Sequence, residues 1–381
     1  MRFSVLLVSI VAALSVLSSL NSANAQSDLD QCRFAGQLDK ADDGIAACDR
    51  VINDTKTPAQ DRASALSSRC GWWWAKKDSD RALKDCNDAV RANRTLAAAY
   101  LNRGNVYLSK SDFDHALADF NEALRLDPKN AWGFAERGNL YKNKGDFDHA
   151  IEDLNEAVKL DPGYALAFFS RGDTYKSKGD LARAMADMNE ALSLDPNYAL
   201  AYFVRGRLSY TLGNAPAAIE DFTKAIKLDD SEATTYFNRG VAYYVLGGRK
   251  PDAIADFKKA TELNPKDAYA ALWRDLAERR NNAPGQLSEA AKQLDMTVWP
   301  APVIRHFLGE LNTEQTLSAA SNADPQVRAA QTCEANFYSG ELALLKKNKK
   351  DAQRLLKLAA DTCPPSFVES TAALADVIAL K

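Results

Sequence analysis

The sequence predicts an all-α protein built as a solenoid of stacked helical hairpins, and three recurring residue types indicate it. A glycine and an alanine each return every 34 residues through the middle of the chain, and a proline closes several of the units. The glycines are Gly104, Gly138, Gly172, Gly206 and Gly240, the alanines are Ala82, Ala116, Ala150, Ala184 and Ala218, and the prolines are Pro128, Pro162 and Pro196. A constant period of this length is typical of repeated supersecondary units that stack on their neighbours.

Each unit contains the pattern of two helices joined by a short turn. Two apolar stripes at helical spacing flank a polar segment such as Lys110-Ser111-Asp112. The recurring glycine and alanine allow the two helices to approach closely. An Asp-Pro pair after Leu126 ends the second helix, because proline disfavours helical backbone in the residue before it. A single hairpin cannot bury its apolar stripe, so neighbouring hairpins must stack.

The composition is that of an ordinary globular protein. Of the 381 residues, 46% are hydrophobic and 26% are charged, and the formal net charge is −3. This weak negative charge does not favour nucleic acid or an anionic membrane surface as a partner.

The N-terminus has the features of a secretory signal. Met1 and Arg2 precede an apolar run from Phe3 to Leu20, and a small-residue motif, Ala23-Asn24-Ala25, follows. We therefore expect a signal peptide over residues 1–25 and a mature protein in the periplasm or outside the cell, the alternative being an uncleaved membrane anchor. No cysteine lies at the expected cut, which argues against lipid attachment there, and we expect no transmembrane segment after cleavage.

Most positions of a unit hold the same residue type from one unit to the next. In the unit numbered from Ala97, position 4 is aromatic, 8 is glycine, 11 tyrosine, 20 alanine, 24 phenylalanine, 27 alanine and 32 proline. Two departures are mild, because Asp230 replaces a closing proline and Ser209 replaces a position-11 tyrosine. Four further units in phase start at Ala131, Ala165, Ala199 and Ala233. This pattern resembles the tetratricopeptide repeat, and the resemblance implies a right-handed superhelix of antiparallel helical hairpins.

Weaker units flank the regular ones, so we expect degenerate repeats at both ends. The expected organisation is a signal peptide (1–25), a degenerate N-terminal hairpin (26–62), six repeat units (63–267), an irregular helical connector (268–325), and a C-terminal repeat-like hairpin with a closing helix (326–381).

The six cysteines fall at facing positions of hairpins. In an antiparallel helix pair, the repeat positions of two facing residues add up to a constant. The positions of Cys32 and Cys48, of Cys70 and Cys86, and of Cys333 and Cys363 all give the same sum. Given the spacing of packed helices, such residues lie within disulfide reach. We therefore expect the pairs Cys32–Cys48, Cys70–Cys86 and Cys333–Cys363. Cross-repeat pairing among the first four cysteines, and free or metal-bound thiols, are the alternatives.

Arginine and aspartate also recur at facing positions, 7 and 23. The arginines are Arg69, Arg103, Arg137, Arg171, Arg205 and Arg239, and the aspartates are Asp85, Asp119, Asp153, Asp187, Asp221 and Asp256. The two end units lack both residues, which suggests that the pair meets across each hairpin. The alternative is a ladder of arginines that binds an acidic ligand.

The resemblance implies that the first helix of each unit lines a concave face, with positions 2, 5, 9 and 12 directed into it. Aromatic side chains flanked by polar ones would suit an extended peptide. The expected binding residues are Asn105, Trp132, Asn139, Lys142, Phe169, Asp173, Lys176, Phe203, Arg207, Tyr210, Phe237 and Tyr244. The alternative is that some of these aromatics belong to the core between repeats. Trp72 and Trp74 are further candidates for exposed aromatics.

These patterns predict a non-catalytic scaffold that binds a protein or extended peptide, with no cofactor and no metal site. The segments Trp299–Pro302 and Cys333–Tyr338 resemble the C-terminal part of bacterial tetratricopeptide proteins of the NlpI type. That resemblance implies an adaptor in cell-envelope complexes, with envelope proteases or peptidoglycan hydrolases as partners. The alternative function is an envelope hydrolase or small-ligand binder that uses residues 281–325, with His306 and Glu310 as an acid–base pair.

Overall fold

The computed structural model describes residues 27–33, 40–247, 250–364 and 367–380, and all regular secondary structure in these ranges is helical. The chain divides after Asp180 into two compact units, which are described separately below. The expected signal peptide, residues 1–25, lies outside the described residues. Within them, no helix has the combined length and apolar character that crossing a bilayer requires.

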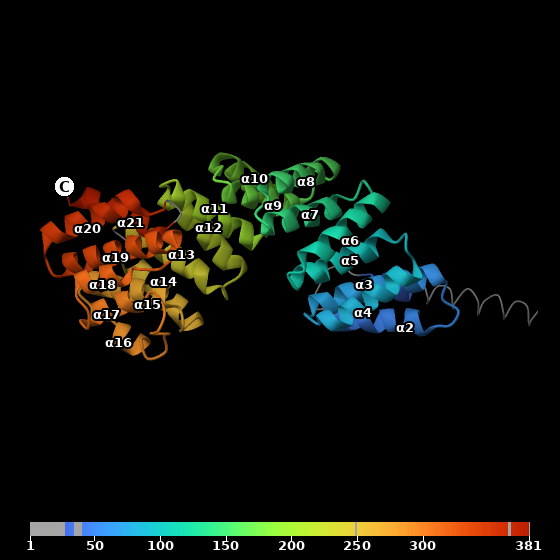
Figure 1. Ribbon diagram of the computed structural model, residues 1–381, viewed down its shortest axis with the longest axis horizontal. Helices are drawn as coiled ribbons and strands as arrows, with labels where there is room; N and C mark the ends of the chain where they lie inside the picture. Colours follow the sequence, from blue (N-terminus) through green and yellow to red (C-terminus); the bar gives the residue numbers. More distant parts are fainter. Residues whose placement is uncertain (1–26, 34–39, 248–249, 365–366, 381) are drawn as a thin grey trace, which may run out of the picture. The chain divides into compact units, whose positions relative to one another are not determined.

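The N-terminal unit is a series of antiparallel helical hairpins, drawn in blue to green in Figure 1. A short helix over residues 27–32 precedes the numbered ones. The helices that follow are α2 (Ala41–Asn53), α3 (Ala59–Ala75), α4 (Ser79–Ala92), α5 (Ala97–Ser109), α6 (Phe113–Leu126), α7 (Ala131–Asn143), α8 (Phe147–Leu160) and α9 (Ala165–Ser177). α3 packs on α4, α5 on α6 and α7 on α8, and each pair contacts the next.

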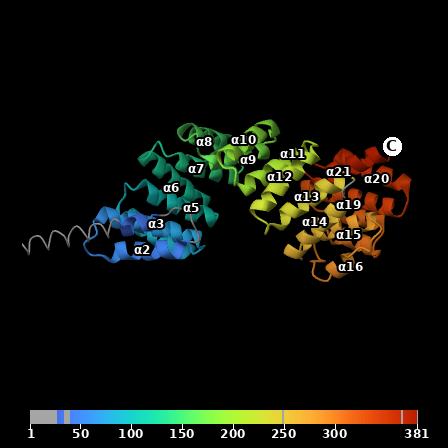
Figure 2. The same cartoon turned by 180° about the vertical axis from the view of Figure 1, so that it is seen from behind.

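The C-terminal unit continues with the same hairpins and ends in less regular helices. The repeat helices are α10 (Leu181–Leu194), α11 (Ala199–Thr211), α12 (Ala215–Leu228), α13 (Ala233–Val245), α14 (Lys250–Leu263) and α15 (Ala268–Arg280). Three short helices follow: α16 (Leu287–Ala290), α17 (Ala301–Leu308) and α18 (Thr313–Ala319). The last hairpin, α19 (Pro325–Leu345) and α20 (Lys349–Thr362), leads into α21 (Val368–Ala379), which also contacts α13 (Figure 2).

Capping residues define where the second helix of each hairpin begins. In α4, α6 and α8, the aspartate before the helix accepts a hydrogen bond from the backbone N–H three residues later, as Asp112 does from His115. Aspartate is among the favoured residues at this position, because its carboxylate pairs a backbone donor that the helix leaves unpaired. The residue before the cap is left-handed, with φ of 60° at Ser111 and 79° at Gly145. The polar turns of the sequence are thus the hairpin turns.

The recurring glycine is required by the contact between the two helices. A Cβ atom added to Gly104 would lie 2.5 Å from the ring of Phe120, and one added to Gly206 would lie 2.8 Å from the ring of Phe222. Both rings are fully buried. In these units, position 8 is therefore glycine because the phenylalanine of the facing helix occupies the space of a side chain.

All three predicted disulfides are confirmed. The Cα–Cα distance is 4.6 Å for Cys32–Cys48, 5.4 Å for Cys70–Cys86 and 5.0 Å for Cys333–Cys363. No free cysteine remains, so cross-repeat pairing and metal-bound thiols are excluded. Each bond joins the two helices of one hairpin near an end of the chain.

The predicted arginine–aspartate pairs form within the hairpins. In five of the six pairs, both residues belong to the same one of the two compact units. Each of these five is a bidentate contact, in which Nε and one terminal nitrogen of the arginine donate to the two carboxylate oxygens at 2.7–2.9 Å. In the sixth pair, Arg171 belongs to the N-terminal compact unit and Asp187 to the C-terminal one. Because the carboxylates already bind the arginines, the alternative of a ladder that binds an acidic ligand is not supported.

The same arginines also join each repeat to the preceding one, which the sequence analysis missed. The second terminal nitrogen of Arg103 donates to Asn87 Oδ1 at 2.9 Å, and that of Arg137 donates to Asn121 Oδ1 at 2.7 Å. Each guanidinium also lies over the aromatic ring at position 4, at 5.6 Å for both Tyr100 and Phe134. The asparagines recur at the same 34-residue spacing, so the signal was present in the sequence.

Replacing Arg137 by methionine is expected to lower the free energy of unfolding by about 2 kcal/mol, because the nearly buried carboxylate of Asp153 loses its charged partner. The double variant Arg137→Met/Asp153→Leu should recover most of this loss, and a double-mutant cycle in urea measures the coupling. Arg125→Met, which removes an exposed pair with Glu122, is the control and should have little effect. Equal losses in the two single arginine variants would contradict the structural role.

Several acidic groups are buried in the core of the C-terminal unit. Glu341 is fully buried, and its carboxylate binds Arg280 at 2.8–3.0 Å and accepts a hydrogen bond from Tyr244 Oη at 3.1 Å. Glu369, on α21, accepts hydrogen bonds from Tyr338 Oη at 3.1 Å and from Trp273 Nε1 at 3.4 Å. These side chains connect α13, α15, α19 and α21, so the closing helix is held to the last repeats by polar as well as apolar contacts.

Candidate functional site

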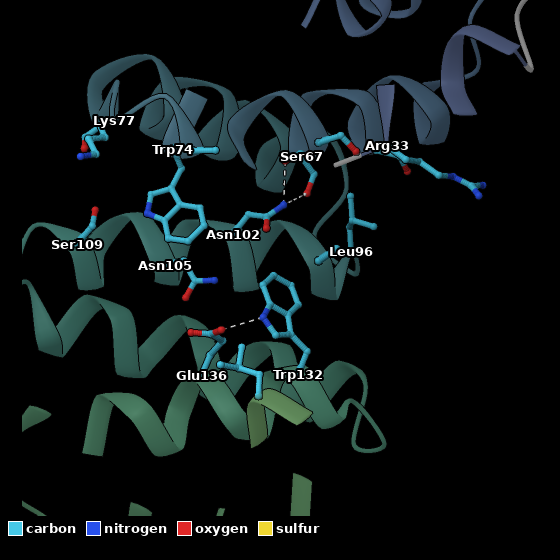
Figure 3. Close-up of a pocket in the computed structure, with 16 residues that line it drawn as sticks. Arg33, Ser67, Trp74, Lys77, Leu96, Asn102, Asn105, Ser109, Trp132 and Glu136 are labelled. Carbon is cyan, nitrogen blue, oxygen red and sulfur yellow. Dashed lines mark hydrogen bonds between the residues drawn. The ribbon is translucent and has the colours of Figure 1, made fainter. Parts of the chain in front are cut away.

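A groove with a volume of about 1120 Å³ runs over the first helices of the hairpins in the N-terminal unit. It is lined by side chains of α3, α5 and α7, and Leu166 at the start of α9 closes one side. Figure 3 shows Trp74 and Trp132 extending into this space from α3 and α7. Side chains of three successive first helices thus line one groove.

The spacing of residues along α5 explains why its polar side chains line the groove. Ala98, Asn102, Asn105 and Ser109 are three or four residues apart, so they share one face of the helix. The opposite face of α5 packs on α6. Trp132 and Glu136 have the same four-residue spacing on α7.

Two asparagines on α5 differ in how their amides are satisfied. The Asn102 amide nitrogen donates to Ser67 O at 2.9 Å and to Ser67 Oγ at 3.1 Å, which fixes α5 against α3. Asn105 is only 4% exposed, yet its Oδ1 has no hydrogen-bond partner. A buried amide oxygen without a donor is costly, so a ligand that supplies one would be stabilised there.

Trp132 and Glu136 form a connected pair on the floor of the groove. The indole Nε1 of Trp132 donates to Glu136 Oε1 at 2.8 Å (Figure 3). Burial raises the pKa of the Glu136 carboxyl, and the hydrogen bond from Trp132 offsets this only in part. The carboxylate is therefore less stable than it would be in water, because burial removes part of its hydration.

The predicted binding residues of the N-terminal unit divide into three groups. Asn105 and Trp132 line the groove. Lys142 donates to Asp173 Oδ2 at 2.7 Å and Lys176 also contacts this carboxylate, so the three expected polar ligands pair with one another.

Two further predicted residues lie outside the groove lining. Phe169 is buried, with 9% of its surface exposed, and Asn139 is half-buried on α7, one turn beyond Glu136.

In the C-terminal unit, four predicted aromatics lie in or against the core. The Phe203 ring packs 5.9 Å from Phe222, and the Phe237 ring packs 6.4 Å from Trp273. The prediction of an open aromatic groove here is therefore corrected in favour of the core alternative. Of the residues predicted in this unit, Arg207 is the one that is exposed.

The closing helix is the physical reason for this correction. Tyr210 donates to the backbone oxygen of Val368 at 3.1 Å, at the start of α21. Tyr244 donates to the buried Glu341 of α19. Side chains that a regular repeat would leave on the inner face are thus covered by the chain's own C-terminal helices.

Of the two further tryptophan candidates, one lines the groove. Trp74 projects into it, whereas Trp72 is 2% exposed and donates from Nε1 to the backbone oxygen of Cys32 at 2.8 Å. Sequence reasoning missed Ser67, Asn102 and Glu136. Asn102 and Glu136 share position 6, three residues before position 9, and this helical spacing could have identified them.

The geometry does not support the alternative acid–base pair. His306 is 4% exposed, and its Nδ1 lies 2.8 Å from the backbone oxygen of Leu311. Burial lowers the pKa of His306. Glu310 is exposed, and its carboxylate lies 3.9 Å from Arg305 rather than on the imidazole.

Comparisons with known proteins agree with the hairpin architecture. Family models described as tetratricopeptide repeat match residues 97–130 and 233–267, and a model described as TPR repeat matches residues 138–179, 172–213 and 206–247. A Haemophilus influenzae protein named lipoprotein NlpI homolog is 30% identical over 139 residues. That alignment spans 35% of this chain and 44% of the relative, less than half of its length.

Two solved structures share the fold. That of Pseudomonas aeruginosa PilF has a TM-score of 0.51 and 17% sequence identity, over 55% of this chain and 96% of that one. A chain of the APC/C hetero-tetramer Cut9–Hcn1 has a TM-score of 0.56 and 16% identity, over 64% of this chain and 46% of that one. With its repeats matched in phase and its hairpins stacked as described, the chain contains tetratricopeptide repeats over residues 97–130 and 138–267.

Proposed function

We propose that this protein is a non-catalytic adaptor that binds an extended segment of a partner protein in the groove over α3, α5 and α7. The observation that carries the proposal is the groove itself, where two tryptophans and a buried, unpaired amide oxygen line about 1120 Å³ of space. Large aromatic side chains supply much of the energy of protein recognition, and amides bond to an extended backbone.

The expected place of action is outside the cytoplasm, in the periplasm of a bacterial cell envelope. Three disulfides support this proposal, since such bonds persist in oxidising compartments and are rare in the cytosol. The partial similarity to a lipoprotein NlpI homolog agrees with an envelope role. Envelope proteases and peptidoglycan hydrolases are therefore the first partners to test.

Replacing Trp132 by alanine should weaken binding of a partner segment at least about tenfold, because truncation of a central aromatic anchor typically costs 2 kcal/mol or more. The probe is a library of end-blocked octapeptides, scanned by fluorescence anisotropy with the full chain. Leu200→Ala is the matched control: Leu200 holds the same repeat position in the C-terminal unit and is 50% exposed. Undiminished peptide binding by a folded Trp132→Ala variant would refute the assignment of the groove.

A further inference from the structure

The charges around the groove are unevenly placed. Glu136 is the one carboxylate among the described residues that line the groove, and it lies near the middle, beside Trp132. The two lining cations, Arg33 and Lys77, lie towards opposite ends in Figure 3, away from Glu136. The centre of the groove is therefore acidic, although the unit also carries basic residues at its rim.

The centre also has more hydrogen-bond acceptors than donors. Glu136 Oε1 accepts from Trp132, but Oε2 has no donor among the described residues. Asn105 Oδ1, on the facing helix α5, is buried and likewise has none. Both side chains project into the same stretch of the groove (Figure 3). A ligand that fits this stretch must bring hydrogen-bond donors.

An acidic ligand does not fit this centre. A carboxylate would face Glu136 and would leave Asn105 Oδ1 unpaired, since a carboxylate only accepts hydrogen bonds. A neutral apolar side chain could contact the tryptophans, but it would bury both acceptors without a donor, which is unfavourable. A basic side chain satisfies the acceptors and places a positive charge beside the carboxylate.

We propose that the groove recognises a partner segment through an arginine or lysine side chain, whose cationic head binds Glu136 and Asn105 while its aliphatic stem lies along Trp132. Arginine suits the site better than lysine, because its planar guanidinium offers five donors and can stack on an indole. This inference rests on the proposed function, and it adds the chemical class of the ligand.

The test uses three end-blocked octapeptides of one sequence, taken from the best binder of the library, with arginine, alanine or glutamate at the central position. The full chain should bind the arginine peptide at least about tenfold more tightly than the alanine peptide, since hydrogen bonds between a guanidinium and a carboxylate are among the strong ones. Glu136→Gln should lower affinity for the arginine peptide to that for the alanine peptide. The same substitution should change the affinity for the alanine peptide much less than the affinity for the arginine peptide, because alanine places no charge beside this position.

Glu156→Gln is the matched control, because Glu156 lies on α8 of the same unit, pairs with Lys159 and does not line the groove. Added salt should weaken binding of the arginine peptide to the wild-type protein more than its binding to Glu136→Gln, since salt screens the charge pair. Circular dichroism melts verify that each variant is folded.

Equal binding of the arginine peptide by folded Glu136→Gln and wild-type protein would overturn the inference. So would a library that selects acidic or neutral residues at every position. If Trp132→Ala still abolishes binding in that case, the proposed function stands and only the ligand class is wrong. If no octapeptide binds the wild-type chain, both proposals fail.

Discussion

Replacing Arg280 by methionine is expected to destabilise the C-terminal unit by about 3–5 kcal/mol at neutral pH, the cost typical of removing one member of a buried ion pair. Arg280 binds Glu341 through two nitrogens and also contacts Asp376 Oδ1 at 2.8 Å. Glu341 is fully buried, so without the guanidinium its charge has no compensating partner. Urea denaturation followed by circular dichroism measures the loss.

Two further variants separate the buried charge from the lost side chain. Arg305→Met removes an exposed arginine of the same unit and should cost less than about 1 kcal/mol. Arg280→Met/Glu341→Gln should recover much of the stability, because a neutral amide replaces the stranded charge. The loss should also shrink at acidic pH, since burial already raises the pKa of Glu341 well above its usual value. A double variant as unstable as Arg280→Met would show that packing, not charge, dominates.

Glu369 is expected to make a contribution to the free energy of unfolding that decreases as the pH rises from about 4.5 to about 7. Burial, together with the nearby Glu334 carboxyl, raises the pKa of this carboxyl from 4.5 to about 7. Between these values the unfolded chain has lost the proton that the folded chain retains. The folded state binds more protons in this window, so its stability decreases with rising pH.

The expected change amounts to roughly 3 kcal/mol, fully present as stability below pH 4.5 and lost above pH 7. Glu369→Gln should remove this term, because the amide keeps an acceptor for Tyr338 and Trp273 and does not titrate. The measurement is the difference in unfolding free energy between wild type and variant at pH 4.5, 6 and 8. Exposed Glu310→Gln is the control. A difference that does not vary with pH would contradict a neutral Glu369 in the folded state.

Periodic contacts were predictable because each recurs with the repeat. Arg137 and Asp153 meet across a hairpin, as do Cys70 and Cys86, and both pairs were assigned from their positions alone. Facing positions in two antiparallel helices have a constant sum, so sequence distance translates directly into spatial proximity. The contact of Arg137 with Asn121 follows the same period and was missed only because positions were compared within units.

Contacts made once in the chain were not predictable in this way. Nothing in the 34-residue pattern indicates that Tyr210 bonds to Val368, because these residues are 158 positions apart and belong to no common repeat. The same holds for Tyr244 and Glu341. The binding residues expected in the C-terminal unit were therefore assigned to an open face that its last helices cover.

The amino-acid order alone determined the hairpins, their capped turns, the three disulfides and the arginine–aspartate pairs, because local helical geometry and a strict period govern all of them. Only the tertiary structure decided where the inner surface is open. It left a groove beside Trp132 and Glu136 in the N-terminal unit, and it folded α21 against α13 in the C-terminal unit. That choice depends on long-range packing of the irregular C-terminal helices, whose buried carboxyls and aromatic side chains form contacts that no repeat encodes.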